Sequence, residues 1–190
     1  MEGNTTAAAG TLDLAKTDLN FADEVKRRSG ADVNLCWHCQ ACAGGCPFVT
    51  AMDHPPNRVI RLVQLGLRGD ALRSSGIWIC VGCNTCSVQC PNAIDIPAVN
   101  DALRQMAIEE GLVAEPNILH FHEAVLSSIE RHGRTHKLGV MLRYKLKKQD
   151  WLDDIVLGLK MFAKRKLELL PSRNSDLKDI RRLFHPKTTG

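Results

Sequence analysis

The feature that most constrains this chain is a cysteine motif that occurs twice with identical spacing. Each copy reads C-x2-C-x2-C-x3-C-P, and together the copies use all eight cysteines: Cys36, Cys39, Cys42 and Cys46 before Pro47, and Cys80, Cys83, Cys86 and Cys90 before Pro91. Spacings this short let one loop present three thiolates to a compact iron–sulfur core, which needs four. The motifs therefore predict two 4Fe–4S clusters, in a loop-rich region that gains much of its stability from them.

The same pattern predicts which cysteines share a cluster. In two-cluster ferredoxins, the fourth cysteine of each run binds the cluster that the other run holds. The expected ligands of the first cluster are Cys36, Cys39, Cys42 and Cys90, and those of the second are Cys80, Cys83, Cys86 and Cys46.

Two other uses of cysteine fit this pattern less well. Structural zinc draws four ligands from two separated pairs, which does not suit three closely spaced thiols followed by Cys-Pro. A disulfide framework belongs to secreted proteins, and residues 1–10 lack the charged and apolar regions of a signal peptide. We therefore expect a reducing, cytoplasmic environment. No long apolar stretch is free of charged residues, so no membrane span is expected.

Charge is distributed unevenly along the chain. Residues 1–110 contain nine Lys and Arg against twelve Asp and Glu (net −3), and residues 111–190 contain sixteen against nine (net +7), which together give the overall +4. Such asymmetry indicates docking to protein partners. A nucleic-acid reader would be expected to interleave basic and aromatic residues, and aromatic residues make up only 5% of the sequence.

Apolar residues recur with helical period along most of the chain. The expected helices are one over 21–28 capped by Asn20, one capped by Asn57 and stopped by Gly66, a short one over 70–75, one that begins at Pro97 and stops at Gly111, one that begins at Pro116 and stops at Gly133, and one over 151–170. A basic segment, 137–148, precedes the last of these.

The two motifs begin 80 − 36 = 44 residues apart, and the gap contains Pro55-Pro56 and an amphipathic helix rather than a β-rich segment. The predicted fold class is therefore all-α: an α-helical ferredoxin-like domain with two cluster loops, followed by a helical C-terminal extension. The expected boundaries are an N-terminal arm and short helix (1–30), the two-cluster domain (31–112), the helical extension (113–171) and a C-terminal tail (172–190).

A few other residues lie close to the motifs in sequence. His38 either tunes the first cluster or is a solvated loop residue, and the two arginines at 58 and 61 either bring positive charge to that cluster or lie on a solvated helix face. Trp37 and Trp78 are expected to pack beside the loops and shield sulfur from water.

Motifs for other chemistry are missing from the sequence. It contains no G-x-G-x-x-G, no P-loop, no G-x-S-x-G and no Cys-Cys pair. A cluster with all four cysteine ligands in place offers no open iron to a substrate. We therefore expect the chain alone to transfer electrons without catalysing a reaction.

Several segments resemble the C-type iron–sulfur subunit of heterodisulfide reductase: the first motif, residues 56–66, residues 77–83, Arg131-His132-Gly133-Arg134 and the residues before Leu169-Leu170-Pro171. The resemblance covers roughly residues 30–171. It implies an all-helical ferredoxin domain with two 4Fe–4S clusters. It also implies two partners: a flavoprotein like the A-type subunit of heterodisulfide reductase, which donates electrons, and a protein like the B-type subunit, whose Cys-Cys-Gly motifs build the clusters that cleave a disulfide.

Two alternatives remain open at this stage. One is the iron–sulfur subunit of another respiratory or quinone-linked oxidoreductase, although many of those carry Cys-Cys-Gly or 2Fe–2S domains in the same chain. The other is a scaffold protein with purely structural clusters, which reversible reduction of both clusters would exclude. The disulfide or thiol substrate and the direction of electron flow also stay open.

Overall fold

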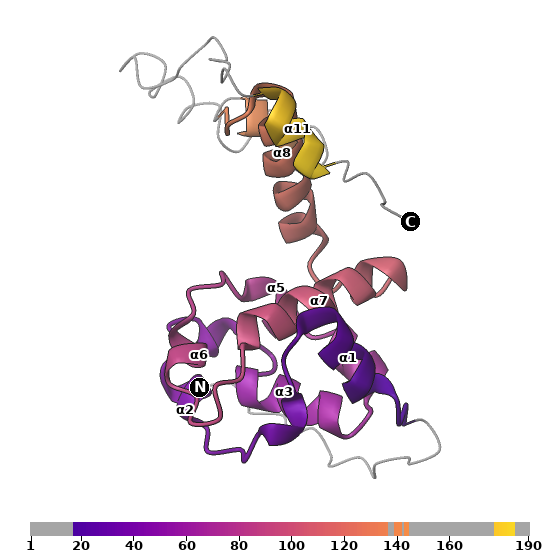
Figure 1. The fold of residues 1–190 in the computed structure, drawn as a ribbon, viewed down its shortest axis with the longest axis vertical. Coiled ribbons are helices and arrows are strands. Elements are labelled where there is room, and N and C mark those ends of the chain that lie inside the picture. Colours follow the sequence, from indigo (N-terminus) through magenta and orange to yellow (C-terminus); the bar gives the residue numbers. More distant parts are fainter. Residues whose placement is uncertain (1–16, 137–138, 142, 145–176, 185–190) are drawn as a thin grey trace, which may run out of the picture. The chain divides into compact units, whose positions relative to one another are not determined.

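The computed structural model describes residues 17–136, 139–141, 143–144 and 177–184. These residues form helices and loops, and none of them lies in a strand, so the predicted all-α class is confirmed (Figure 1). The chain divides into two compact units, Met1–Ala114 and Glu115–Gly190. No helix among the described residues is long and apolar enough to cross a membrane.

The first unit is a small helical bundle that supports two cysteine loops. Its elements are α1 (Phe21–Ser29), η2 (Val33–Leu35), α2 (Ala41–Gly44), η3 (Val49–Ala51), α3 (Pro56–Gln64), α4 (Arg68–Leu72), α5 (Ser75–Ile79), α6 (Thr85–Val88) and α7 (Ile96–Glu109). Helix α7 packs against α1, α4 and α5, and α3 packs against α1, α4 and α5. The fully buried side chains include Phe21, Val25, Ile60, Val63, Leu72, Ile77, Leu103 and Met106. This apolar core fixes α3 and α7, the helices that follow the two motifs.

Arg68 joins three parts of this unit. Its guanidinium lies 3.0 Å from the carboxylate of Asp18, 2.7 Å from Glu24 on α1, and 2.6 Å from Glu110 at the end of α7. It also stacks over the ring of Phe21, 5.2 Å from the centroid. The hydrogen bond from Arg68 lowers the pKa of the Glu24 carboxyl, although partial burial opposes that shift.

Asp53 connects the segment after the first motif to the helix before the second. Its carboxylate accepts hydrogen bonds from Ser74 Oγ at 2.8 Å, Ser75 N at 3.1 Å and Gly76 N at 2.9 Å. Burial alone would raise the pKa of this carboxyl, but these bonds and one from the backbone N–H of His54 outweigh it and hold the pKa well below its usual range. Asp53 therefore accepts from two free N–H groups at the start of α5, and the N-cap residue Ser74 shares one of them, since its Oγ also accepts from Gly76 N at 3.1 Å.

The helix starts differ from the sequence prediction in three places. Helix α7 begins at Ile96, one residue before the predicted Pro97, and the Asp95 side chain caps it. Asn20 occupies the N-cap position of α1, but its side chain makes no capping bond. Helix α3 begins at Pro56 with Pro55 as its cap, so Asn57 lies inside the first turn and the predicted cap is wrong. Proline suits this first position because its missing N–H would have no partner there. Helices α4 and α5 also replace the single short helix expected over 70–75.

The second unit contains α8 (Pro116–His132) and α11 (Leu177–Phe184), which pack against each other. Helix α8 begins and ends where predicted, with Gly133 in the left-handed conformation at its C-terminus. Helix α11 lies in the segment for which the sequence predicted no helix. The predicted helix over 151–170 lies outside the described residues.

Candidate metal centre

The two cysteine motifs fold in the same way. The backbone adopts the left-handed conformation at His38 and Gln40 of the first motif, and at Gly82 and Asn84, which stand 44 residues later in the second. A short helix follows in each case, α2 in the first and α6 in the second. Left-handed residues reverse the chain sharply, so each loop turns its cysteines toward one side.

Burial of the thiols repeats as well. The third cysteine of each motif, Cys42 or Cys86, is buried, whereas the second, Cys39 or Cys83, is exposed. The first and fourth cysteines of both motifs are half-buried. Each loop therefore surrounds a space that is closed on the protein side and open near its second cysteine.

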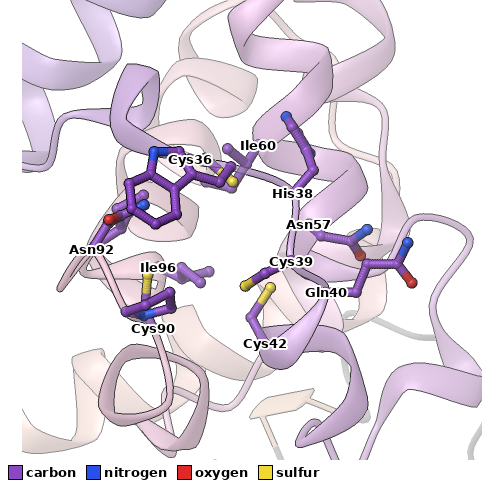
Figure 2. Close-up of a pocket in the computed structure, with 13 residues that line it drawn as sticks. Cys36, His38, Cys39, Gln40, Cys42, Asn57, Ile60, Cys90, Asn92 and Ile96 are labelled. Atoms are coloured by element: carbon purple, nitrogen blue, oxygen red, sulfur yellow. The ribbon is translucent and has the colours of Figure 1, made fainter.

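The structure contains a pocket beside each loop, and each pocket combines cysteines from both motifs. The first pocket is lined by Cys36, Cys39, Cys42 and Cys90, and the second by Cys80, Cys83, Cys86 and Cys46. In Figure 2 the four sulfur atoms of the first pocket face the space between them. Counting space open to solvent, the pockets measure about 380 and 370 Å³. These groups of four match the predicted ligand sets; the ligand roles themselves stay a prediction.

The pocket walls suit iron–sulfur clusters. Ile60, Ile94 and Ile96 line the first pocket, and Phe48, Met52 and Pro97 line the second. Asn57 in the first pocket and Asn100 in the second each have a buried Oδ1 with no hydrogen-bond partner among the described residues. Four thiols around one zinc ion would lie about 3.8 Å apart. Among the described residues, no three Cys, His, Asp or Glu side chains form a group that could hold a metal ion.

The electrostatics of the thiols follow from their burial. Burial raises the pKa of Cys42 to about 11, and the nearby thiols of Cys36 and Cys86 add to the shift. Burial, followed by the neighbouring Cys80, likewise raises the pKa of Cys86. The pKa of exposed Cys83 is lowered, chiefly by its hydrogen bond with the Thr85 hydroxyl. Buried thiolates are therefore costly here without positive charge, which bound iron supplies.

The two pockets are neighbours. Helix α2 packs against α6, and the two lie side by side in Figure 1. The Gln89 side chain lies directly over Gly45, where an added Cβ would be 2.1 Å from Gln89 Oε1. A glycine at this position lets the two loops approach closely.

Side chains from α3 and α7 hold the start of each loop through two backbone carbonyls; we call each such pair of contacts a carbonyl clamp. Gln64 Nε2 donates to Val33 O at 2.8 Å and to Cys36 O at 3.4 Å. Arg104 Nε donates to Ile77 O at 2.6 Å, and its Nη2 donates to Cys80 O. Neither Gln64 nor Arg104 was predicted from the sequence to be part of the site.

The structure also shows where the other residues that the sequence analysis named near the motifs lie. His38 is held by a hydrogen bond from its Nε2 to Gln64 Oε1 at 2.7 Å, and in Figure 2 its side chain extends away from the four sulfur atoms. Trp37 lines the first pocket although it is 76% exposed. Trp78 is buried but is not among the residues that line the second pocket. The shielding of sulfur by these side chains stays a prediction. Arg61 is exposed and donates to Gln64 Oε1 at 3.3 Å. Arg58 is exposed.

Fold and pockets together define a helical protein that carries two iron–sulfur clusters. Residues 32–94 match the family described as a 4Fe-4S dicluster domain, which confirms two 4Fe–4S clusters as the cofactors. Over 130 residues, the chain is 32% identical to the second C-type iron–sulfur subunit of the CoB–CoM heterodisulfide reductase of Methanocaldococcus jannaschii, a match that covers 64% of this chain and 67% of that protein. The chain belongs to the family of C-type iron–sulfur subunits of heterodisulfide reductase.

Other relatives match over a smaller share of their length. The C-type subunit of the H(2):CoB-CoM heterodisulfide,ferredoxin reductase of Methanothermobacter thermautotrophicus is 27% identical over 116 residues, which are 61% of this chain and 60% of that protein. The C-type subunit of the Ferredoxin:CoB-CoM heterodisulfide reductase of Methanosarcina mazei is 32% identical over 90 residues, or 47% and 55% of the two chains. The matched region thus spans about three fifths of the Methanothermobacter protein.

Proposed function

We propose that this chain is a cytoplasmic electron-transfer subunit of a heterodisulfide-reductase-type complex. It passes electrons through its two clusters between a flavin-bearing subunit and a Cys-Cys-Gly subunit that acts on a disulfide. Cys36, Cys39, Cys42 and Cys90 would hold the first cluster, and Cys80, Cys83, Cys86 and Cys46 the second. Each bound cluster would take up and release one electron.

The observation that carries the proposal is the pairing of two adjacent pockets, each lined by four cysteines. One cluster alone could stabilise a loop, but two neighbouring clusters provide consecutive sites for an electron. The exposed second cysteines, Cys39 and Cys83, lie where each pocket approaches the surface. One cluster can therefore face an electron donor and the other an acceptor.

The first test is the composition and redox behaviour of the anaerobically purified protein. About eight irons and eight sulfides per chain are expected, and both clusters should be reduced reversibly. Stoichiometric zinc, or clusters that no reductant reduces, would exclude the function.

The second test concerns the partners. A flavoprotein and a Cys-Cys-Gly protein from the same organism should co-purify with the chain. Its reduced clusters should then be reoxidised only when the Cys-Cys-Gly protein and a disulfide are both present. Equally fast reoxidation by the disulfide alone would contradict the relay.

A further inference from the structure

The two carbonyl clamps are equivalent by position but differ in charge. Gln64 is the ninth residue of α3, which begins at Pro56, and Arg104 is the ninth residue of α7, which begins at Ile96. The carbonyls that they bind are equivalent too, because Val33 and Cys36 stand 44 residues before Ile77 and Cys80. The first loop is therefore held by a neutral amide and the second by a permanent cation.

We propose that this substitution within the repeat gives the second cluster the higher reduction potential, so that the first electron to enter the chain resides there. The inference rests on the proposed electron-transfer function. Reduction adds one electron to a cluster and forms or breaks no bond. A fixed positive charge beside the reduced cluster stabilises the added negative charge, and net charge is one of the terms that set the potential.

A second difference between the loops acts in the same direction. Cys83 Sγ and Thr85 Oγ1 lie 3.5 Å apart in the second motif, whereas Ala41 occupies the position equivalent to Thr85 and has no hydroxyl. When Cys83 binds iron as a thiolate, this hydroxyl is the donor. Hydrogen bonds to cluster sulfurs favour the more negatively charged state.

Two other charged side chains near the clamps, Asp101 and Arg61, reduce the proposed difference between the two reduction potentials only in part. Asp101 Oδ1 pairs with Arg104 Nη1 at 2.9 Å, but its side chain is 63% exposed while that of Arg104 is 16% exposed. Solvent screens the aspartate more than the arginine. Near the first loop, Arg61 reaches Gln64 rather than the loop carbonyls and is exposed, so its charge is both more distant from the loop and better screened. The His38 side chain is also hydrogen-bonded to the Gln64 side-chain amide, through its Oε1.

One asparagine of each pocket is placed alike, and a second one lines the first pocket alone. Asn57 lines the first pocket and Asn100 the second, and neither buried Oδ1 has a partner among the described residues. Asn92 also lines the first pocket, where its Nδ2 donates to Leu35 O. The charge of the clamp and the Thr85 hydroxyl are the two differences that favour a higher potential at the second cluster.

The experiment is a redox titration of the full-length holoprotein with mediators, monitored by electron paramagnetic resonance. Arg104→Gln installs the neutral clamp of the first loop, and the higher of the two midpoint potentials should fall while the lower stays. Arg104→Lys keeps the charge and should retain most of the separation. Arg27→Gln removes one exposed arginine from α1 and should move neither midpoint.

A fall of the lower midpoint, an equal fall of both, or no change in Arg104→Gln would overturn the assignment. If Arg104→Gln loses a cluster, Asp101→Asn tests the proposal instead, because it leaves the Arg104 clamp in place and removes the negative charge that is paired with Arg104. The higher midpoint should then rise, and an unchanged midpoint would overturn the proposal. Wild-type protein without two reducible clusters would instead refute the proposed function itself.

Discussion

Replacing Asp53 with alanine should destabilise the ferredoxin unit and loosen its second loop. The variant removes the acceptor for Ser74 Oγ and for two backbone N–H groups in the first turn of α5. The N-cap Ser74 stays and still accepts from Gly76 N at 3.1 Å. The bonds from Ser75 N and from the Ser74 hydroxyl lose this acceptor, at roughly 1 kcal/mol each. We expect a loss of about 2 kcal/mol, which for a chain of this length lowers Tm by about 4–8 °C.

Thermal unfolding under anaerobic conditions, followed by far-ultraviolet circular dichroism at one scan rate, measures this shift. Asp70→Ala is the matched control, because Asp70 is an exposed aspartate in the first turn of α4, and its Tm should change by less than about 2 °C. The visible absorption of the clusters should also bleach faster in Asp53→Ala, because α5 supplies the Ile77 carbonyl that the second clamp holds.

The pKa of Asp53 gives the sign of the pH dependence. Because the folded-state pKa is lowered, the contribution of Asp53 is complete above the unfolded value of about 4 and is lost as pH falls through the folded value. The Tm difference between wild type and Asp53→Ala should therefore be constant from about pH 6 to 9. A Tm equal to that of Asp70→Ala, or a difference that varies within this range, would refute the capping role.

Three further predictions concern ligands, packing and docking. Cys90→Ser should disturb the cluster held by the first three cysteines of the first motif and Cys46→Ser the other one; paramagnetic resonance in which each variant lost its own motif's cluster would contradict the crossed assignment. Arg68→Met should lower Tm by about 4–8 °C, since three half-exposed ion pairs and a ring contact contribute about 2 kcal/mol, and an unchanged Tm would show that solvent screens the network. Deletion of residues 135–190 should retain both clusters but abolish co-purification with the catalytic subunit, because this deletion removes much of the +7 half of the chain; assembly of the shortened chain at normal yield would exclude docking by this region.

The parts of the structure that depend on local spacing were predictable from the sequence. The helix that ends at Gly133 was found because a proline start, an apolar period and a glycine stop all agree. Helix α11 carried a similar signal in Leu177, Ile180 and Phe184, which the basic composition of the tail concealed. The cap at Asn57 was misplaced because a proline immediately before it starts the helix without a side-chain cap.

The contacts that support the pockets were not predictable in this way. Asp53 and Ser74 are separated by 21 residues, and no local pattern connects a loop aspartate with a distant helix start. The equivalence of the two clamps was not predictable for another reason. The two motifs are offset by 44 residues, but the starts of α3 and α7 are offset by only 40, because the segment that joins the second motif to its helix is shorter. Gln64 and Arg104 therefore do not align in a simple comparison of the two halves.

The contribution of Cys90 to the first pocket and Cys46 to the second has a consequence for how the protein matures and decays. Insertion of one cluster would draw the end of the opposite motif into place and so prepare the other pocket before its iron arrives. A partly matured preparation should accordingly contain fewer half-filled molecules than independent loading of the two pockets would give. By the same linkage, oxygen damage at one cluster would release a thiol that lies at the end of the other motif, so that loss of one cluster would hasten, without requiring, loss of the second.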